Sequence, residues 1–294
     1  MTVDILIPFW GDPGLLFDTV DSVFAQTDDD WTLTVIDDAY PDETVPARFA
    51  AMDDPRVTYV RHEHNEGIVA GFRECVARGR SEWLVVLGCD DLLHPRYVEL
   101  VHRTAAAHPG ADIIQPGVQV IDSDGRPSAP LADRVKRMLA PSTRAGDAVL
   151  RGEALATSLT RGNWLYWPSL AFRTATIQRH DFRDDLPIIL DLAILLDIAF
   201  DGGTLVFTPE LAFSYRRHSA SASQTSLLDG RRFSDERRYY GEIAARSAAA
   251  GWRSTARAAR WRPFSRLHAA TELPRVLRHG SAAGRRAAFA HILG

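Results

Sequence analysis

Short apolar runs alternate with amphipathic segments through the first 121 residues. Segments of helical periodicity separate the runs, and Asp12 and Pro13 are placed to start the first of these helices. This alternation predicts an α/β fold, with a mostly parallel, Rossmann-like sheet covered by helices on both faces. Ligands bind such sheets at the carboxyl ends of the strands. The predicted strands are residues 3–9, 31–37, 57–62, 83–87 and 113–121.

The pattern changes after residue 121. Residues 122–161 combine three prolines with scattered charges and predict a loop-rich insertion. An apolar helix from about Pro187 to Phe200 and a pair of strands near residues 204–207 and 212–216 follow. From Asp229 onward an Ala/Arg-rich pattern predicts helices. We expect breaks near Gly251, Pro263, Pro274 and Gly280.

Charge is distributed unevenly along the chain. The formal net charge is −4, but residues 231–294 hold 14 arginines and 4 acidic residues, a balance of +10, which leaves −14 for residues 1–230. An acidic surface argues against nucleic acid as a partner, because phosphate backbones bind basic surfaces. Nearly all basic residues are arginine, and we attribute the single lysine, Lys136, to genome composition.

The cysteines and apolar segments indicate where the protein acts. Cys75 and Cys89 match neither a metal-ligand spacing nor a secreted disulfide framework. The first residues carry no basic leader, and the apolar stretch 186–200 is interrupted by Asp191 and Asp197 and is too short to span a bilayer. We therefore expect a cytoplasmic protein.

Two adjacent carboxylates end a buried strand in the segment WLVVLGCDDLLHP, residues 83–95. One alternative is that Asp91 caps the helix that follows. Two carboxylates held together, however, repel each other unless a cation or a proton lies between them. Mg²⁺ typically takes one or two protein carboxylates and substrate phosphates. The pair of Asp90 and Asp91 therefore predicts a Mg²⁺ or Mn²⁺ site that assists the departure of a phosphate or diphosphate group.

Further motifs place this pair in a wider pattern. ILIPFW is followed by SVFAQT (22–27), VIDDAYPDET (35–44), NEGIVAGF (65–72) and LGCDDLLHP (87–95), and weaker similarity continues in GNWLYWPSLAFR (162–173) and YRRHSASAS (215–223). In order and spacing, residues 3–121 resemble the family 2 glycosyltransferases of the GT-A fold. The resemblance implies an inverting transferase that moves a hexosyl or deoxyhexosyl group from a UDP-, dTDP- or GDP-sugar to a hydroxyl acceptor.

The same resemblance implies a division of labour along the chain. Residues 1–121 form the part of the GT-A domain that binds the nucleotide-sugar. Residues 122–228 bind the acceptor and complete catalysis, and residues 229–294 are a helical C-terminal extension. The acceptor it implies is a carbohydrate, a lipid-linked molecule or a natural product with a free hydroxyl group.

The resemblance assigns the nucleotide to the ends of the first strands. Asp38, supported by Asp37, bonds the base, and an aromatic ring can cover a base face. Alternatives remain open for two residues: Asp37 as a turn-forming residue, and Arg73 as a helix-surface arginine. The full set expected at the nucleotide-sugar is Pro8, Phe9, Trp10, Asp37, Asp38, Asn65, Gly67, Arg73, Asp91, Arg216 and Arg217.

The metal motif departs from the family pattern. Aligned on Pro95, its positions are Gly88, Cys89 and Asp90, so the first acid is missing. Asp90 is then the metal ligand, and Asp91 its neighbour or second ligand. This loss motivates an alternative hypothesis, a non-catalytic nucleotide-sugar-binding or scaffold protein.

The late motif YRRHSASAS supplies further candidates. His218 is a candidate third metal ligand, and Arg216 and Arg217 are candidates to hold the diphosphate, because arginine forks suit phosphate oxygens. The alternatives are a surface histidine and one arginine that faces solvent, since neighbours on an extended chain point oppositely.

Transfer with inversion needs a carboxylate that removes the proton from the acceptor hydroxyl. Asp191 is the candidate by position, and partial burial among its apolar neighbours would raise its pKa. The alternative is an acid placed to favour the helix dipole. Asn163, Trp164 and Trp167 are candidates for an acceptor platform; the alternative is a packed aromatic core.

The Arg-rich extension admits two interpretations. Basic helices with aromatic residues suggest peripheral contact with the inner face of the plasma membrane, next to a lipid-linked acceptor. The other interpretation is a helical subdomain packed on the acidic catalytic part, or a homodimer contact. We favour this second interpretation.

Overall fold

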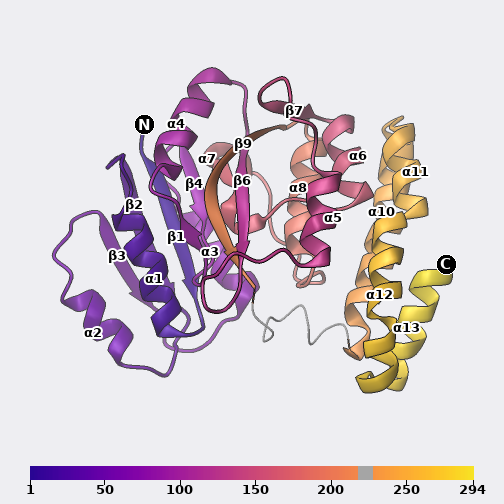
Figure 1. Ribbon diagram of the computed structural model, residues 1–294, viewed down its shortest axis with the longest axis horizontal. Helices are drawn as coiled ribbons and strands as arrows, with labels where there is room; N and C mark the ends of the chain where they lie inside the picture. Colours follow the sequence, from indigo (N-terminus) through magenta and orange to yellow (C-terminus); the bar gives the residue numbers. More distant parts are fainter. Residues whose placement is uncertain (218–227) are drawn as a thin grey trace.

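The computed structural model describes residues 1–217 and 228–294 and contains one mixed sheet (Figure 1). Along the sheet the strands follow the order β3-β2-β1-β4-β8-β6-β9-β5, and β7 pairs with β9. They are β1 (Val3–Phe9), β2 (Trp31–Asp37), β3 (Val57–Arg61), β4 (Trp83–Val86), β5 (Leu92–Leu93), β6 (Ile113–Ile121), β7 (Ala148–Arg151), β8 (Ala171–Arg173) and β9 (Thr204–Arg216).

Strand direction divides the sheet. Strands β1 to β4 pair in parallel, as do β6 and β9. Strand β8 runs antiparallel between β4 and β6, and β5 and β7 run antiparallel to β9. The predicted fold class is confirmed, and the parallel pairs bring the polar ends of β1 and β2 to one edge.

Helices cover both faces of the sheet. Alternate residues of β1 enter different cores, since Ile5 and Ile7 pack with Leu16 whereas Leu6 packs with Leu155. Asp12 caps the first helix as predicted, with Oδ1 2.7 Å from the amide of Gly14. These helices are α1 (Pro13–Phe24), α2 (Thr44–Ala50), α3 (Ile68–Arg78), α4 (Tyr97–Ala107), α5 (Leu131–Leu139), α6 (Glu153–Arg161), η1 (Trp167–Ser169), α7 (Thr174–Ile177) and α8 (Leu190–Phe200).

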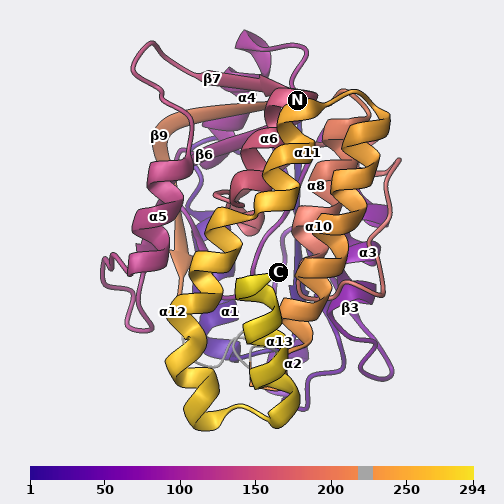
Figure 2. The same ribbon diagram turned by 90° about the vertical axis from the view of Figure 1, so that its right-hand side faces the viewer.

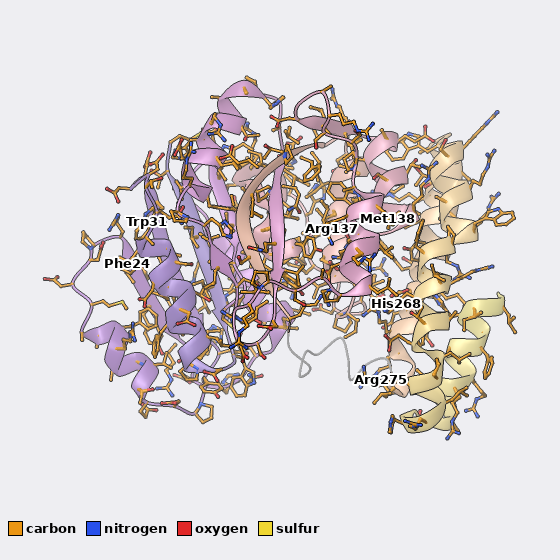
Figure 3. The ribbon with its side chains drawn as sticks, in the orientation of Figure 1. Phe24, Trp31, Arg137, Met138, His268 and Arg275 are labelled. Carbon is orange, nitrogen blue, oxygen red and sulfur yellow. The ribbon has the colours of Figure 1, made fainter. Side chains whose placement is uncertain are left out.

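Aromatic side chains join the helices to the sheet at several places. Phe24, the last residue of α1, meets Trp31, the first residue of β2, edge to face with their ring centroids 5.5 Å apart (Figure 3). Trp31 is almost fully buried. This contact ties the α1–β2 connection to the core.

Three predictions about local structure were wrong. Residues 122–161 form α5, β7 and α6 instead of a loop-rich insertion, because Pro130 and Pro141 stand at the two ends of α5 and do not break it. The expected strand pair near 204–216 is one continuous strand, β9, bent at a register shift opposite Gly117. Pro274 lies inside a helix and ends none.

The C-terminal extension packs on the catalytic part as a layer of helices (Figures 1 and 2). Helix α10 places Tyr239 and Ile243 in the same core as α8. At the surface, Arg246 pairs with Asp197, and Arg183 lies 2.5 Å from Glu242. The packed-subdomain interpretation therefore describes this extension. Its helices are α10 (Arg231–Ala249), α11 (Arg253–Trp261), α12 (Pro263–His279) and α13 (Ala282–Leu293).

The length and hydropathy of the helices bear on whether the chain could cross a membrane. Within residues 1–217 and 228–294, no helix combines the length and the apolar character that a bilayer span requires.

Candidate active site

An aromatic pair stands at the carboxyl end of β1. The ring of Trp10 is 52% exposed and meets Tyr40 edge to face, with ring centroids 5.3 Å apart. Phe9 packs on the other side of Tyr40 but lies in the core, so the structure corrects the expectation that its ring flanks a nucleoside. Pro8 is partly exposed beside Gly71 of α3. Tyr40 was missed, although its position two residues after Asp38 could have indicated it.

Asp37 is fully buried at the end of β2. Its Oδ1 accepts the Tyr40 amide at 2.8 Å, and its Oδ2 accepts the Tyr59 hydroxyl. Burial, and then this bond, raise the pKa of Tyr59. Asp37 therefore organises the turn after β2, as the turn-forming alternative anticipated.

Asp38 connects the end of β2 to the Asn-x-Gly turn. Its carboxylate accepts the amides of Glu66 at 2.8 Å and Gly67 at 2.9 Å, and it lies 2.8 Å from Nδ1 of His62. The Nδ2 of Asn65 reaches the Asp38 carbonyl at 3.4 Å. A carboxylate offers about four acceptor positions, so one position remains after these three bonds.

His62 bridges two carboxylates. Its Nδ1 faces Asp38, and its Nε2 lies 2.6 Å from Glu74 of α3. Burial lowers the pKa of His62, but its bonds to these carboxylates outweigh burial and leave the pKa raised. The imidazole therefore helps to hold the expected base-binding residue in place.

The two acids after β4 have different environments. Asp91 is 1% exposed, and its Oδ1 accepts the backbone amide of Arg216 at 2.8 Å. Burial, and then the charge of Asp90, raise the pKa of Asp91 well above its usual range. Asp90 is only partly buried. Asp91 thus ties this loop to β9, while Asp90 is placed closer to solvent.

Gly88 holds the position of the missing acid. A Cβ atom there would lie 2.5 Å from Oδ2 of Asp91 and 3.3 Å from Oδ1 of Asp90. The buried carboxylate of Asp91 therefore occupies the space that a side chain at position 88 would need. Cys89 is largely enclosed, and burial raises its thiol pKa to about 12, so it acts as a packing residue.

The arginines expected near the diphosphate have partners within the protein. Arg216 is buried, with Nε 2.8 Å from the Asp90 carbonyl. Arg217 donates two hydrogen bonds, of 2.6 and 2.8 Å, to the carboxylate of Asp133 in α5. Arg73 bonds Asp181 and the Phe182 carbonyl, both at 2.7 Å. His218 lies outside the described residues.

These contacts bear on the expected metal. In the described part of the chain, no group of three or more His, Cys, Asp or Glu side chains is arranged to hold a metal ion. Mg²⁺ and Mn²⁺ sites that also use substrate phosphates need only one or two protein carboxylates. Asp90 suits that requirement, whereas the visible role of Asp91 is structural.

Asp191 lies in the first turn of α8 and is held by Asn163. The Nδ2 of Asn163 is 3.0 Å from Oδ2 of Asp191. Burial raises the pKa of Asp191, while the charges of Lys136 and Arg232 and the bond from Asn163 oppose that shift. Asp197, on the same helix, faces the C-terminal extension and pairs with Arg246. The two acids of α8 therefore have separate roles.

Lys136 approaches the same region from α5. Its Nζ lies 2.6 Å from the Leu165 carbonyl and 4.2 Å from the ring centre of Tyr166. Burial lowers the pKa of Lys136 to about 8, although the Asp191 charge favours the ammonium form. Lys136 stands out in the sequence as the only lysine in an arginine-rich chain, but its attribution to genome composition gave no indication of this position near Asp191.

The two expected acceptor tryptophans are core residues. Trp164 is 3% exposed and donates from Nε1 to Ser158 at 3.0 Å. Trp167 is 7% exposed and packs against Phe172, with ring centroids 5.0 Å apart. The aromatic-core alternative therefore describes both rings, and of the three expected acceptor residues only Asn163 reaches Asp191.

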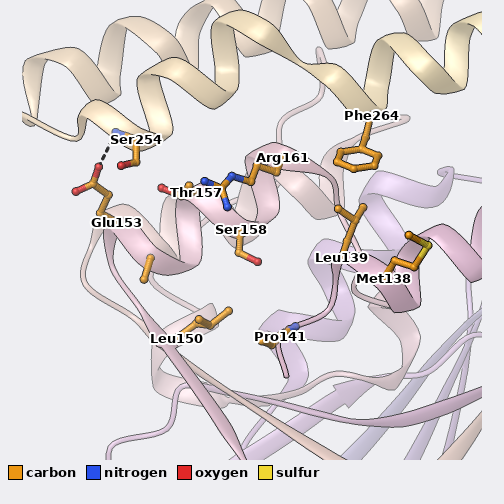
Figure 4. A pocket seen from close by; sticks show the side chains of 11 residues that line it. Met138, Leu139, Pro141, Leu150, Glu153, Thr157, Ser158, Arg161, Ser254 and Phe264 are labelled. Atoms are coloured by element: carbon orange, nitrogen blue, oxygen red, sulfur yellow. Dashed lines mark hydrogen bonds between the residues drawn. The ribbon is translucent and has the colours of Figure 1, made fainter. Parts of the chain in front are cut away.

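A cleft of about 710 Å³ lies where the catalytic part meets the C-terminal extension (Figure 4). Met138 and Leu150 form part of its apolar wall, opposite Phe264 of α12. At one end, the Ser254 amide of α11 donates to Glu153 of α6 at 3.0 Å. The extension thus builds one wall of a cleft that the sequence did not predict.

Comparisons with known proteins identify relatives of this chain. The chain is 28% identical over 217 residues to the succinoglycan biosynthesis protein ExoO of Rhizobium meliloti, a match that covers 71% of the chain and 59% of that protein. The crystal structure of S. aureus TarS 1–349 in complex with UDP-GlcNAc superimposes with a TM-score of 0.62 at 12% identity, covering 83% of the chain and 66% of that structure. The chain therefore spans about three-fifths of the length of ExoO.

The family model for glycosyl transferase family 2 matches residues 4–161, more than half of the chain. That range includes the strand ends occupied by Trp10, Asp37, Asp38 and Asp90. The chain belongs to glycosyl transferase family 2.

Proposed function

We propose that this protein is an inverting glycosyltransferase that moves a sugar from a nucleotide diphosphate-sugar to a hydroxyl acceptor, with a divalent metal bound at Asp90 and with Asp191 as the base. The observation that carries this proposal is the Asp191–Asn163 pair, a partly exposed carboxylate in a desolvated setting that raises its pKa. An acid of this kind is suited to accept a proton near neutral pH.

Contacts at the end of β9 link the loop of Asp90 to α5, the helix that carries Lys136. Arg216 bonds the Asp90 carbonyl, and its neighbour Arg217 bonds Asp133 of α5. Lys136 lies one turn further along α5, where its charge acts on Asp191. These contacts support the proposal that the end of β9 connects the donor side to the acceptor side.

In the proposed reaction, the acceptor hydroxyl oxygen forms a bond to the anomeric carbon of the donor sugar. The bond from that carbon to the diphosphate breaks on the opposite face, and its electron pair leaves with the diphosphate. Asp191 takes the hydroxyl proton, and Asn163 holds its carboxylate in position. Trp10 and Tyr40 are placed to cover the base, and Asp38 to accept a bond from it.

Asp90 is the residue proposed to hold the divalent metal, with donor phosphates completing its ligands. When bound, Mn²⁺ or Mg²⁺ offsets the negative charge of the departing diphosphate. The buried Asp91 supports this loop through its bond to β9.

The relatives suggest the class of donor and acceptor. The TarS complex contains UDP-GlcNAc, which supports a UDP-sugar as the first donor to test before dTDP- and GDP-sugars. The name of the R. meliloti relative supports an acceptor from polysaccharide biosynthesis. We propose action at the cytoplasmic face of the membrane, where exposed Trp261 and Leu267 of the extension are available for peripheral contact.

The test combines binding and turnover. With Mn²⁺ present, UDP, dTDP and GDP are compared by thermal stabilisation, and the matching sugar nucleotides by donor hydrolysis and transfer. Asp90→Ala should abolish metal-dependent nucleotide binding, whereas Asp124→Ala, in an exposed loop, should not. Asp191→Asn should keep binding and lose about 10²–10⁴-fold in transfer rate. Asp197→Asn on the same helix is the matched control.

Two outcomes would contradict the proposal. Normal transfer by Asp191→Asn would remove Asp191 as the base. Nucleotide binding without donor hydrolysis across a broad donor panel would favour the alternative, a non-catalytic nucleotide-sugar-binding protein, which the replacement of the first motif acid by Gly88 motivates.

A further inference from the structure

The corner between α11 and α12 has an unusual backbone. Arg262 connects the two helices with φ 44° and ψ 46°, and it is one of two non-glycine residues with positive φ in the described chain. Its side chain is nevertheless buried, with the residue 5% exposed. A charged residue is thus held in the left-handed region and inside the protein, where glycine would be easier to accommodate.

Charge at this corner is unbalanced. The Nε atoms of Arg262 and Arg266 are buried and have no hydrogen-bond acceptor among residues 1–217 and 228–294. Burial lowers the pKa of Arg262, and the charges of Arg266 and of Arg237 on α10 lower it further. Buried cations without a partner are costly, so native proteins usually pair them.

The neighbouring carboxylate offsets this positive charge only in part. The charge of Glu236 reaches Arg262, but its two oxygens already bond Arg232 at 3.0 Å and Ser265 at 2.5 Å. Residues 218–227, outside the described part, contain no Asp or Glu. Other arginines of the extension, in contrast, have acidic partners: Arg238 pairs with Asp185 and Arg246 with Asp197.

The start of α12 adds to the positive field. This helix of 17 residues begins without a side-chain cap, and its first residue, Pro263, has no amide hydrogen. The amino terminus of a long helix favours an anion through its free amides and its dipole. Arg237 is exposed and Arg266 is partly exposed, so part of this arginine cluster faces solvent.

From these observations we propose that the α11–α12 corner binds a phosphate group between Arg237, Arg262 and Arg266. The ligand is a phosphate monoester or diester, carried either by a soluble molecule or by an anionic lipid headgroup. The guanidinium groups supply charge-assisted bonds to the anion, whose negative charge offsets the clustered positive charges. This site is separate from the nucleotide site and goes beyond the proposed transfer activity.

The first experiment measures binding of inorganic phosphate to the full chain by calorimetry and thermal stabilisation, against chloride at equal ionic strength. The wild type should be stabilised by phosphate. Arg262→Gly and Arg266→Gln should lose roughly tenfold or more in affinity. Arg257→Gln, an exposed arginine of α11, should bind as the wild type does. Without phosphate, Arg262→Gly should melt at the same or a higher temperature, because it removes a buried charge and glycine adopts a positive φ without strain.

A second experiment identifies the source of the phosphate group. Vesicles of phosphatidylglycerol and of phosphatidylcholine are mixed with each variant and sedimented. Binding to phosphatidylglycerol that Arg262→Gly abolishes and that phosphate competes away indicates a lipid headgroup. Stabilisation by phosphate without vesicle binding indicates a soluble ligand.

The proposal is overturned if the wild type shows no response to either probe, or if Arg262→Gly and Arg266→Gln respond as strongly as the wild type. Stabilisation by UDP and Mn²⁺, measured in the same variants, should be unchanged. Loss of that stabilisation in every protein would concern the transferase proposal and would leave the phosphate result standing.

Discussion

The side-chain amide of Asn163 donates to the carboxylate of Asp191 across 3.0 Å, although 28 residues separate them in the chain. The bond joins the segment before η1 to the first turn of α8. It leaves Asp191 only partly exposed and fixed in orientation, while burial raises its pKa. The proposed proton acceptor and the group that orients it are therefore held together without a bound substrate.

The pH dependence of transfer should report on this pair. Because burial raises the pKa of Asp191, the acid limb of kcat/KM should lie above the ordinary carboxyl pKa of 3.8. The Asn163 amide and the Lys136 ammonium both favour the ionised carboxylate, so Asn163→Ala and Lys136→Met should move the limb to higher pH. Rate profiles against pH measure the shift. Lys136→Arg keeps the positive charge, so its acid limb should lie at the wild-type pH. Acid limbs that coincide in all variants would contradict this account.

Filling position 88 should destabilise the protein and should not repair the metal motif. A Cβ atom would meet Oδ2 of Asp91 at 2.5 Å, so Gly88→Ala should cost about 1–3 kcal/mol in the free energy of unfolding. Urea unfolding measures the cost. Gly110→Ala is the control, because nothing lies within 4 Å of its added Cβ. Gly88→Asp should bind Mn²⁺ and UDP no more tightly than the wild type; tighter binding would show that the loop can rearrange to admit the acid.

The stability of the junction between the catalytic part and the extension should depend on one stacked aromatic pair. Trp252 lies parallel to Phe200 of α8, with ring centroids 4.6 Å apart and an interplanar angle of 5°. Trp252→Ala should therefore lower the free energy of unfolding by about 2–3 kcal/mol. Trp261→Ala removes a ring that is 69% exposed and should change it by less than about 0.5 kcal/mol. Equal effects of the two changes in thermal or urea unfolding would refute this role for the stack.

Stability should also respond to the buried imidazole of His291. Its Nδ1 lies 3.0 Å from the Phe233 carbonyl, and burial lowers its pKa below the ordinary 6.5. The folded protein then holds this group neutral while the unfolded chain takes up a proton below pH 6.5, so the free energy of unfolding should fall as the pH drops through that range. The free energies of unfolding of wild type and His291→Gln, measured by urea unfolding, should converge as the pH falls through that range. His279→Gln, at the exposed end of α12, should keep the wild-type slope.

Much of the site at the strand ends could be predicted from local pattern. The ends of β1, β2 and β4 are where the apolar periodicity placed them, and the Asp12 cap and the separation of Asp191 from Asp197 follow from helical spacing. The helix α5 could not be recognised in the same way. Its buried residue is the charged Asp133, whereas the apolar Leu131 and Met138 are exposed, so its apolar positions do not mark a core-facing side.

The sequence by itself determined the family, the fold class and which acids stand at the ends of buried strands, because apolar periodicity and motif order are properties of neighbouring residues. Only the tertiary structure decided how each polar group is used. It turned Asp91 inward to β9, engaged Arg216 and Arg217 with protein oxygens, buried Trp164 and Trp167, and brought Asn163 to Asp191. Burial and hydrogen-bond partners come from segments far apart in the chain, and one sequence pattern is compatible with several such arrangements.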